Sequence, residues 1–188
     1  MADAQQSLIE HVELAGRVAE LLPALGRVTA LLIACFEGGG RLYTFGNGGS
    51  AADSLHLAEE LVARFERDRS PLPAQSLAAD PTVLTCIAND WEFDEVFARQ
   101  VRAFARPGDV VAGFTTSGRS ANVVRGLAAA RERGAATVLF TGGDGMPAAE
   151  QADHALVVPS TVTARVQEMH VLLLHLLLES VDEWADGR

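Results

Sequence analysis

Apolar residues recur at helical spacing along the first part of the chain, over residues 6–22 and again over residues 24–37. Pro23 separates the two stretches, and three consecutive glycines, Gly38 to Gly40, follow the second. The pattern therefore predicts two helices that form an N-terminal hairpin ahead of the first strand. A hairpin in that position either packs against another subunit or covers one face of a sheet, and the pattern supports both equally.

The pattern changes after residue 41, where short apolar runs begin to alternate with amphipathic stretches. We expect strands at residues 42–45, 74–78, 110–114, 137–140 and 155–158, and helices at residues 50–66, from 80, 92–104, 120–133 and 162–184. Alternation of this kind indicates a parallel sheet with both faces covered. The sequence shows no internal repeat and no linker. It therefore predicts one α/β domain over residues 1–188, with a five-stranded, mainly parallel sheet flanked by helices.

Composition narrows the classes of partner. The chain has 188 residues and a net charge of −10, with 48% hydrophobic and 21% charged residues, which is the balance of a globular protein. The negative charge argues against nucleic-acid binding. The N-terminus lacks the basic region of a signal peptide, and the apolar run 171–178 is too short to span a bilayer. We expect a cytoplasmic protein with no nucleic-acid or membrane partner.

The two cysteines carry little functional signal. Cys35 and Cys86 do not form a CxxC motif or another metal-binding spacing. A disulfide framework or a cysteine-type zinc site is therefore not expected, and we predict two small, buried thiols.

A glycine-rich loop, Gly46-Asn47-Gly48-Gly49-Ser50, directly follows the first predicted strand and precedes a helix. Its glycines allow close approach to a ligand, and the helix start offers free N–H groups and a partial positive charge that suit a phosphate. Ser50 can cap the helix and bond a phosphate oxygen. The loop is neither a Walker motif nor GxGxxG, so on its own it could also be a simple tight turn.

A second loop, Thr115-Thr116-Ser117-Gly118-Arg119-Ser120, occupies the equivalent place after another predicted strand. Such loops are often only solvated turns or caps. The carboxyl ends of parallel strands, however, share one edge of the sheet, where ligands bind. Two loops of this kind at one edge therefore favour a phosphosugar site.

Two helices carry candidate metal ligands and acid–base groups. His56 and Glu60 are four residues apart, so they share one face of a helix, although a simple surface contact would give the same spacing. The terminal helix carries Gln167 and, within an apolar run, His175, which is also consistent with a core histidine. Together the four side chains offer the N and O ligands that zinc accepts.

Six stretches of the sequence, taken together, resemble the SIS (sugar isomerase) domain family. Within that family, the similarity to the phosphoheptose isomerases extends over almost the whole chain. Each stretch alone is unspecific, whereas the combination is specific. The shared stretches are Phe45-Gly-Asn-Gly-Gly-Ser50, His56-Leu-Ala-Glu-Glu60, Ala88-Asn-Asp90, Thr115-Thr-Ser-Gly-Arg-Ser-Ala-Asn122, Thr141-Gly-Gly-Asp-Gly145 and Arg165-Val-Gln-Glu-Met-His170 with His175.

The resemblance implies an aldose–ketose isomerase that converts sedoheptulose 7-phosphate to D-glycero-D-manno-heptose 7-phosphate, in heptose-nucleotide biosynthesis. It implies a homotetramer with active sites between subunits, in which residues 1–38 serve oligomerisation. It also implies one Zn²⁺ per subunit at His56, Glu60, Gln167 and His175. The substrate contacts that follow from the loops and the resemblance are Asn47, Gly48, Gly49, Ser50, Glu60, Asn89, Asp90, Thr115, Thr116, Ser117, Ser120 and Gln167.

Two positions depart from the family pattern. Ala164 stands where some members carry an acidic residue, which removes any acid–base role at that position. Arg119 replaces the commoner Asn, and it either attracts phosphate or points to solvent.

We assign the catalytic roles to Glu60 and His175, because moving a proton between two carbons needs a base and a partner acid within hydrogen-bond reach. Two non-catalytic alternatives stay open. One is a regulator that binds the replication initiator. Residues 163–170 also resemble the corresponding segment of that regulator, although it lacks the equivalents of Glu60 and His175. The other is a sugar-phosphate sensor that keeps the pocket and has lost catalysis.

Overall fold

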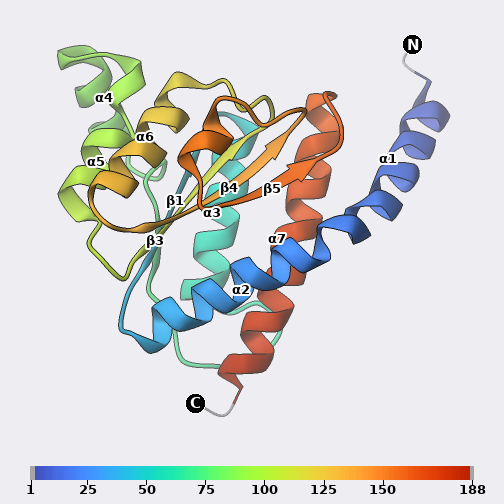
Figure 1. Ribbon diagram of the computed structural model, residues 1–188, viewed down its shortest axis with the longest axis horizontal. Helices are drawn as coiled ribbons and strands as arrows, with labels where there is room; N and C mark the ends of the chain where they lie inside the picture. The colour runs from blue at the N-terminus through green and yellow to red at the C-terminus, as the bar shows by residue number, and fades with distance from the viewer. Residues whose placement is uncertain (1–2, 187–188) are drawn as a thin grey trace.

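The computed structural model describes residues 3–186, and at its centre is a parallel sheet in the order β2-β1-β3-β4-β5 (Figure 1). Every pairing between neighbouring strands is parallel, which confirms the predicted five-stranded α/β architecture. The strands are β1 (Leu42–Gly46), β2 (Ala74–Ser76), β3 (Val110–Thr115), β4 (Ala136–Gly142) and β5 (His154–Val158). The helices are α1 (Ala4–Val18), α2 (Leu22–Glu37), α3 (Gly49–Val62), α4 (Pro81–Asp90), α5 (Ala98–Phe104), α6 (Ala121–Glu132) and α7 (Thr163–Ala185). Three 3₁₀ turns, η1 (Ala19–Leu21), η2 (Phe93–Glu95) and η3 (Ala148–Gln151), complete the order.

The helices divide between the two faces of the sheet. Buried side chains of four helices form one core with the strands, among them Leu14 of α1, Val28 of α2, Leu57 of α3 and Leu173 of α7. Side chains of α5 and α6, such as Val101 and Leu127, form a second core on the opposite face. This arrangement places α3 and α7 side by side, with both helices starting at the carboxyl edge of the sheet (Figure 1).

The predicted N-terminal hairpin is wrong. α1, η1 and α2 follow one another as a long, bent helical segment that crosses the outside of α7 (Figure 1). Pro23 does not reverse the chain, because it lies in the first turn of α2. A backbone N–H in that turn would have no helical acceptor, so proline is compatible with the helix there. The 3₁₀ turn at 19–21 only bends the segment.

The same segment, from Ala4 to Glu37, is long and apolar enough to cross a membrane by length and composition. A core helix of a globular protein meets the same criteria. α2 packs Leu25, Val28 and Leu32 into the first core, each less than 5% exposed. These contacts account for the apolar composition of α2 by packing against the sheet and α7.

Three smaller expectations also need correction. α3 ends at Val62 rather than continuing to residue 66, because the Arg69 side chain binds the carbonyl groups at its end. The expected helix 92–104 is divided into η2 and α5, with Glu92 in an extended conformation before η2. Cys86 is exposed on α4, within 3.6 Å of Asp90, whereas Cys35 is buried as expected, and both are free thiols.

Candidate active site

The two loops predicted to bind phosphate follow neighbouring strands. The glycine-rich loop follows β1 and the Ser/Thr loop follows β3, and these strands pair directly. The chain leaves β1 toward β2 on one side and reaches β3, β4 and β5 on the other, so the order reverses between β1 and β3. Ligands of open parallel sheets bind at such a reversal, outside the carboxyl ends of the strands. The fold therefore brings both loops to the position expected of a ligand site.

A reciprocal pair of hydrogen bonds joins the glycine-rich loop to the start of α6, just after the Ser/Thr loop. Asn47 Nδ2 donates to Asn122 Oδ1 at 2.8 Å, and Asn122 Nδ2 donates to Asn47 Oδ1 at 2.9 Å. Asn122 is only 2% exposed, in the first turn of α6. The Asn47 side chain, predicted to contact substrate, therefore links the glycine-rich loop to α6 in this structure. Sequence reasoning gave Asn122 no role, although a polar residue at the start of a helix next to a candidate loop is a usable signal.

The backbone of the glycine-rich loop presents the start of α3. Gly48 has φ +57°, which favours glycine, and it is the N-cap of α3. Ser50 lies inside the helix, 4% exposed, so its predicted capping role is wrong, and among the described residues no side chain caps α3. The N–H groups of Ser50 and Ala51 donate instead to the carbonyl oxygens of Asn47 and Gly48, each at 3.0 Å. The start of α3 still carries the partial positive charge that attracts an anion.

The Ser/Thr loop borders a cavity of about 770 Å³, a size typical of small-ligand sites. Thr116 and Ser117 line it, while Thr115 and Ser120 lie behind them with hydroxyl oxygens 3.4 Å apart. Loops after β4 and β5 complete the wall, and sequence reasoning gave them no role, although they follow strands at the same edge. The lining residues are Thr116, Ser117, Arg119, Gly143, Asp144, Pro159, Ser160, Thr161 and Thr163.

Arg119 lies in the wall of this cavity and is largely exposed. Its Nη2 is 3.5 Å from Asp144 Oδ2, and both side chains are more than half exposed. An exposed pair of this kind is weak. The guanidinium group is thus available to an anion in the cavity at little cost.

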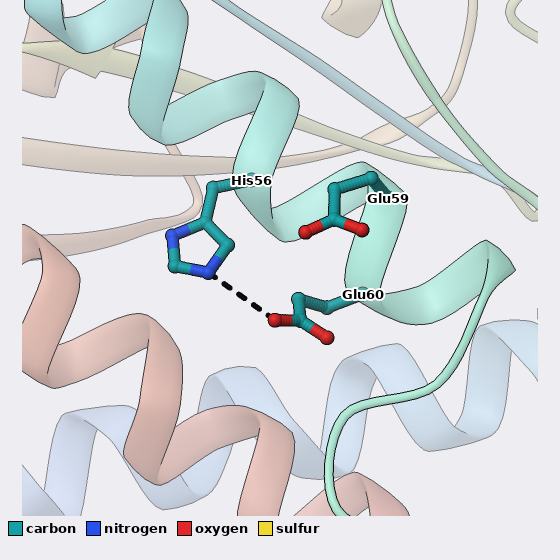
Figure 2. Close-up of side chains that lie close together, drawn as sticks. All are labelled: His56, Glu59 and Glu60. Carbon is teal, nitrogen blue, oxygen red and sulfur yellow. Dashed lines mark ion pairs between the residues drawn. The ribbon is translucent and has the colours of Figure 1, made fainter.

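His56, Glu60 and His175 come together halfway along α3 and α7. His56 Nε2 lies 3.3 Å from Glu60 Oε1, and the His56 and His175 rings meet edge to face with centroids 5.2 Å apart. Figure 2 shows His56 and Glu60 facing each other, with Glu59 beside them on α3. Ligand atoms of His56, Glu59 and Glu60 all lie within 4.8 Å of one another. Glu59 was not among the predicted residues.

This group fits a divalent metal in its donor chemistry and spacing. Imidazole nitrogen and carboxylate oxygen are zinc ligands, and neighbouring ligands around tetrahedral zinc lie about 3.3 Å apart for bonds near 2 Å. The His56–Glu60 distance matches that spacing. The described residues therefore include a His/Glu group whose side chains could hold a metal ion.

Gln167 lies elsewhere on α7. A Cβ placed on Gly49 would come within 2.3 Å of Gln167 Nε2, so the Gln167 amide lies against the glycine-rich loop. His175 is eight residues further along α7, about 12 Å along the helix axis. Within one chain, Gln167 is therefore placed beside the glycine-rich loop and not beside His56 and Glu60.

Asn89 and Asp90 occupy the last turn of α4. Both are exposed, and Asn89 Nδ2 donates to Asp90 Oδ1 at 2.8 Å. Neither lines the 770 Å³ cavity. Their predicted contact with substrate stays a prediction.

Comparison with known proteins shows to which family the chain belongs. The SIS domain model matches residues 10–142. A phosphoheptose isomerase of Paramagnetospirillum magneticum is 46% identical over 94% of this chain and 93% of its own length, and one of Aquifex aeolicus is 47% identical over 83% and 82%. The solved phosphoheptose isomerase of Neisseria gonorrhoeae superposes with a TM-score of 0.90 at 37% identity, covering 95% of this chain and 96% of that one.

The chain belongs to the phosphoheptose isomerase family of SIS domain proteins.

Family membership confirms the resemblance seen in the sequence and the fold that it implied. As in the phosphoheptose isomerases it matches, this chain is an aldose–ketose isomerase by family. The structure adds where the candidate groups lie: the glycine-rich and Ser/Thr loops at the carboxyl edge of the sheet, and the His56–Glu60–His175 group halfway along α3 and α7.

Proposed function

We propose that this chain converts sedoheptulose 7-phosphate to D-glycero-D-manno-heptose 7-phosphate, for heptose-nucleotide biosynthesis, with Glu60 as the base and His175 as the partner acid. The proposal rests on the contacts of His56 with Glu60 on α3 and with His175 on α7. The chain that carries them belongs to the phosphoheptose isomerase family. This group supplies a carboxylate and two imidazoles, which are the side chains that most often transfer protons in enzymes.

The proposed reaction moves one proton from C1 to C2. Glu60 removes a proton from C1, the electron pair forms the C1–C2 double bond, and His175 protonates the C2 carbonyl oxygen to give an enediol. Glu60 then returns its proton to C2, while the C1 hydroxyl gives its proton back to His175 and becomes the aldehyde. Each residue ends in its starting state, so no co-reactant is consumed.

The two loops hold the phosphate away from the reacting carbons in this proposal. The positive end of the α3 helix attracts the phosphate, and the hydroxyls of the Ser/Thr loop donate hydrogen bonds to its oxygens. Binding energy there keeps C1 and C2 in register. Arg119 adds a positive charge at the cavity wall. The residues proposed to contact substrate are Asn47, Gly48, Gly49, Ser50, Asn89, Asp90, Thr115, Thr116, Ser117, Ser120 and Gln167, besides Glu60.

We propose zinc as the cofactor, held by His56, Glu60 and His175, with Gln167 as the fourth ligand in the assembled oligomer. Bound there, zinc would polarise the substrate carbonyl and stabilise negative charge on the enediolate oxygen. The donor set and the 3.3 Å spacing of His56 and Glu60 support this assignment.

We further propose a homotetramer with sites shared between subunits. Gly49 and Glu60 are eleven residues apart on α3, which is about 16 Å along the helix axis. This distance is longer than a single side chain can reach. A second subunit can bring its own Glu60 and His175 to the phosphate loops of the first. Exposed apolar side chains on α1, Leu8, Ile9 and Val12, support a role for residues 1–38 in that contact.

The non-catalytic alternatives are less well supported. A regulator or a sugar-phosphate sensor needs the loops but has no use for an imidazole that contacts both a carboxylate and a second imidazole. The net charge of −10 argues against nucleic-acid binding, and a sugar-phosphate substrate and a cytoplasmic location follow from the proposed reaction.

The test is turnover of sedoheptulose 7-phosphate, followed by the appearance of the aldose. We expect turnover by the wild type and a loss of about 10²–10⁴-fold in kcat for Glu60→Gln and His175→Ala. Near-full turnover by both variants would contradict the assigned roles. Binding of the ketose without turnover by the wild type would favour the sensor.

A further inference from the structure

A buried ion pair ties the segment after α3 to the last turns of α7. Arg69 Nε lies 2.6 Å from Asp182 Oδ1, and the two side chains are 0% and 1% exposed. The other carboxylate oxygen, Asp182 Oδ2, accepts the backbone N–H groups of Glu66 at 2.9 Å and Arg67 at 3.0 Å. Asp182 thus fixes the course of the chain just beyond α3.

The same arginine binds the end of α3 itself. Its Nη2 donates to the Glu60 carbonyl oxygen at 2.9 Å, and its Nη1 donates to the Leu61 carbonyl oxygen at 2.9 Å. The last carbonyls of a helix lack helical donors and carry partial negative charge. A guanidinium group supplies both hydrogen-bond donors and a positive charge. The peptide group of Glu60 is therefore held directly by Arg69.

α7 carries both the partner of this arginine and the proposed acid. Asp182 is seven residues, or two turns, beyond His175 on one continuous helix. A short path of hydrogen bonds thus runs from Glu60 through Arg69 and Asp182 to the helix that bears His175.

We propose that Arg69 and Asp182 are positioning residues that hold Glu60 in the group with His56 and His175. The inference rests on the proposed roles of Glu60 and His175. Proton transfer depends on distances controlled to a fraction of an ångström, and a misplacement of about 1 Å can cost about 10²-fold in rate. Arg69 and Asp182 touch no reacting atom, and they act through the backbone of Glu60.

The double variant Arg69→Met/Asp182→Asn separates positioning from folding. Replacing a buried ion pair with uncharged side chains often leaves stability unchanged. The amide oxygen introduced at position 182 would still accept the backbone N–H groups of Glu66 and Arg67, so only the grip on α3 is lost. We expect kcat to fall by about 10- to 100-fold, with KM changed less than about twofold because the glycine-rich loop lies at the other end of α3 and the Ser/Thr loop lies outside α3.

A neighbouring ion pair supplies the matched control. Arg67 Nη1 and Asp186 Oδ2 join the same two segments 2.5 Å apart, but both side chains are about half exposed. Neither residue is hydrogen-bonded to the carbonyl groups at the end of α3 among the described contacts. We expect Arg67→Met/Asp186→Asn to keep wild-type kcat and KM.

Each assay is run at a temperature at which circular dichroism shows the variant to be fully folded. If Glu60→Gln abolishes turnover while Arg69→Met/Asp182→Asn keeps wild-type kcat, the positioning role is overturned and the proposed reaction stands. If Glu60→Gln keeps wild-type turnover, the proposed roles and this inference both fail. If the double variant does not fold, Arg69→Lys takes its place, because one ammonium group cannot bind Asp182 and both carbonyls in the same geometry. A folded Arg69→Lys with wild-type kcat would overturn the inference equally.

Discussion

At the residue scale, the structure changes the picture of Gln167 most. Its residue type and its helix made it a candidate metal ligand, but its amide lies against Gly49, where a Cβ would come within 2.3 Å of Nε2. The conflict would be with the far end of a flexible side chain, so the side chain can move. Gly49 thus lets the Gln167 side chain reach the glycine-rich loop.

Gly49→Ala should therefore move Gln167 away from the loop at little cost in stability, below about 1 kcal/mol. We expect kcat/KM for sedoheptulose 7-phosphate to fall by about tenfold or more, because Gln167 is proposed to contact substrate. Steady-state kinetics and urea unfolding measure the two effects. Gly26→Ala is the control, since a Cβ there would meet no described atom within 4 Å. An unchanged kcat/KM in Gly49→Ala would show that the contact does not matter.

The chemistry of several residues could be predicted from the sequence, whereas their neighbours could not. Helical spacing placed His56 and Glu60 on one face, and they lie 3.3 Å apart. The link between Asn47 and Asn122 depends on the pairing of β1 with β3, which spacing along the chain does not encode. The same holds for the contact between His56 and His175, which depends on how α3 and α7 pack.

At the element scale, periodicity predicted which segments are helices and strands but not how helices end or turn. The strands agree with the apolar runs because buried parallel strands read as short apolar stretches. The end of α3 depends on Arg69, which lies beyond the helix and binds its last carbonyls. The direction of the chain at Pro23 depends on the local turn, and proline in a first helical turn is compatible with a bend or with a reversal.

The Arg69–Asp182 pair predicts acid sensitivity for the α3–α7 contact. Burial opposes ionisation of Asp182, but the N–H groups of Arg67 and Glu66 and the Arg69 guanidinium outweigh it and hold the pKa of Asp182 below its usual 3.8. A lowered folded-state pKa stabilises the fold above pH 3.8, and that stabilisation is lost as pH falls through the folded-state value.

Urea unfolding of the wild type and of Asp182→Asn between pH 7 and pH 2.5 tests this. We expect Asp182→Asn to be less stable at pH 7 by about 3 kcal/mol, because it leaves the Arg69 charge buried without its partner. The difference should shrink as the pH falls below 3.8. Parallel pH profiles for the two proteins would show that Asp182 does not carry this part of the acid dependence.

At the scale of the whole molecule, the distance between the glycine-rich loop at Gly49 and Glu60 is the feature that the sequence did not predict. Both lie on α3, and the sequence suggested that one helix links phosphate binding to chemistry. The helix places them about 16 Å apart along its axis, so the proposed reaction needs a second subunit. We propose that residues 1–188 form one domain of such an assembly; the chain covers 96% of the solved relative from Neisseria gonorrhoeae.

Leu8→Glu/Val12→Glu should weaken the assembly. The Leu8 and Val12 side chains are each 62% exposed on α1. Burying one such side chain against a partner subunit is worth about 1.5–3 kcal/mol. We therefore expect the dissociation constant of the oligomer to rise by more than about tenfold. Sedimentation velocity measures it. Gln5→Glu/Gln6→Glu adds the same charge to α1 without removing apolar surface, and we expect it to assemble as the wild type does. Equal assembly of both variants would rule out this face of α1 as a subunit contact.

The central claim is that Glu60 moves the proton between C1 and C2. NMR of sedoheptulose 7-phosphate in D₂O tests it directly, because a base that exchanges with solvent delivers deuterium to C2 of the aldose and to C1 of the remaining ketose. We expect the wild type to incorporate deuterium at both carbons, and Glu60→Gln to bind the ketose but lose exchange by about 10²-fold or more. Exchange by Glu60→Gln at the wild-type rate would contradict the account.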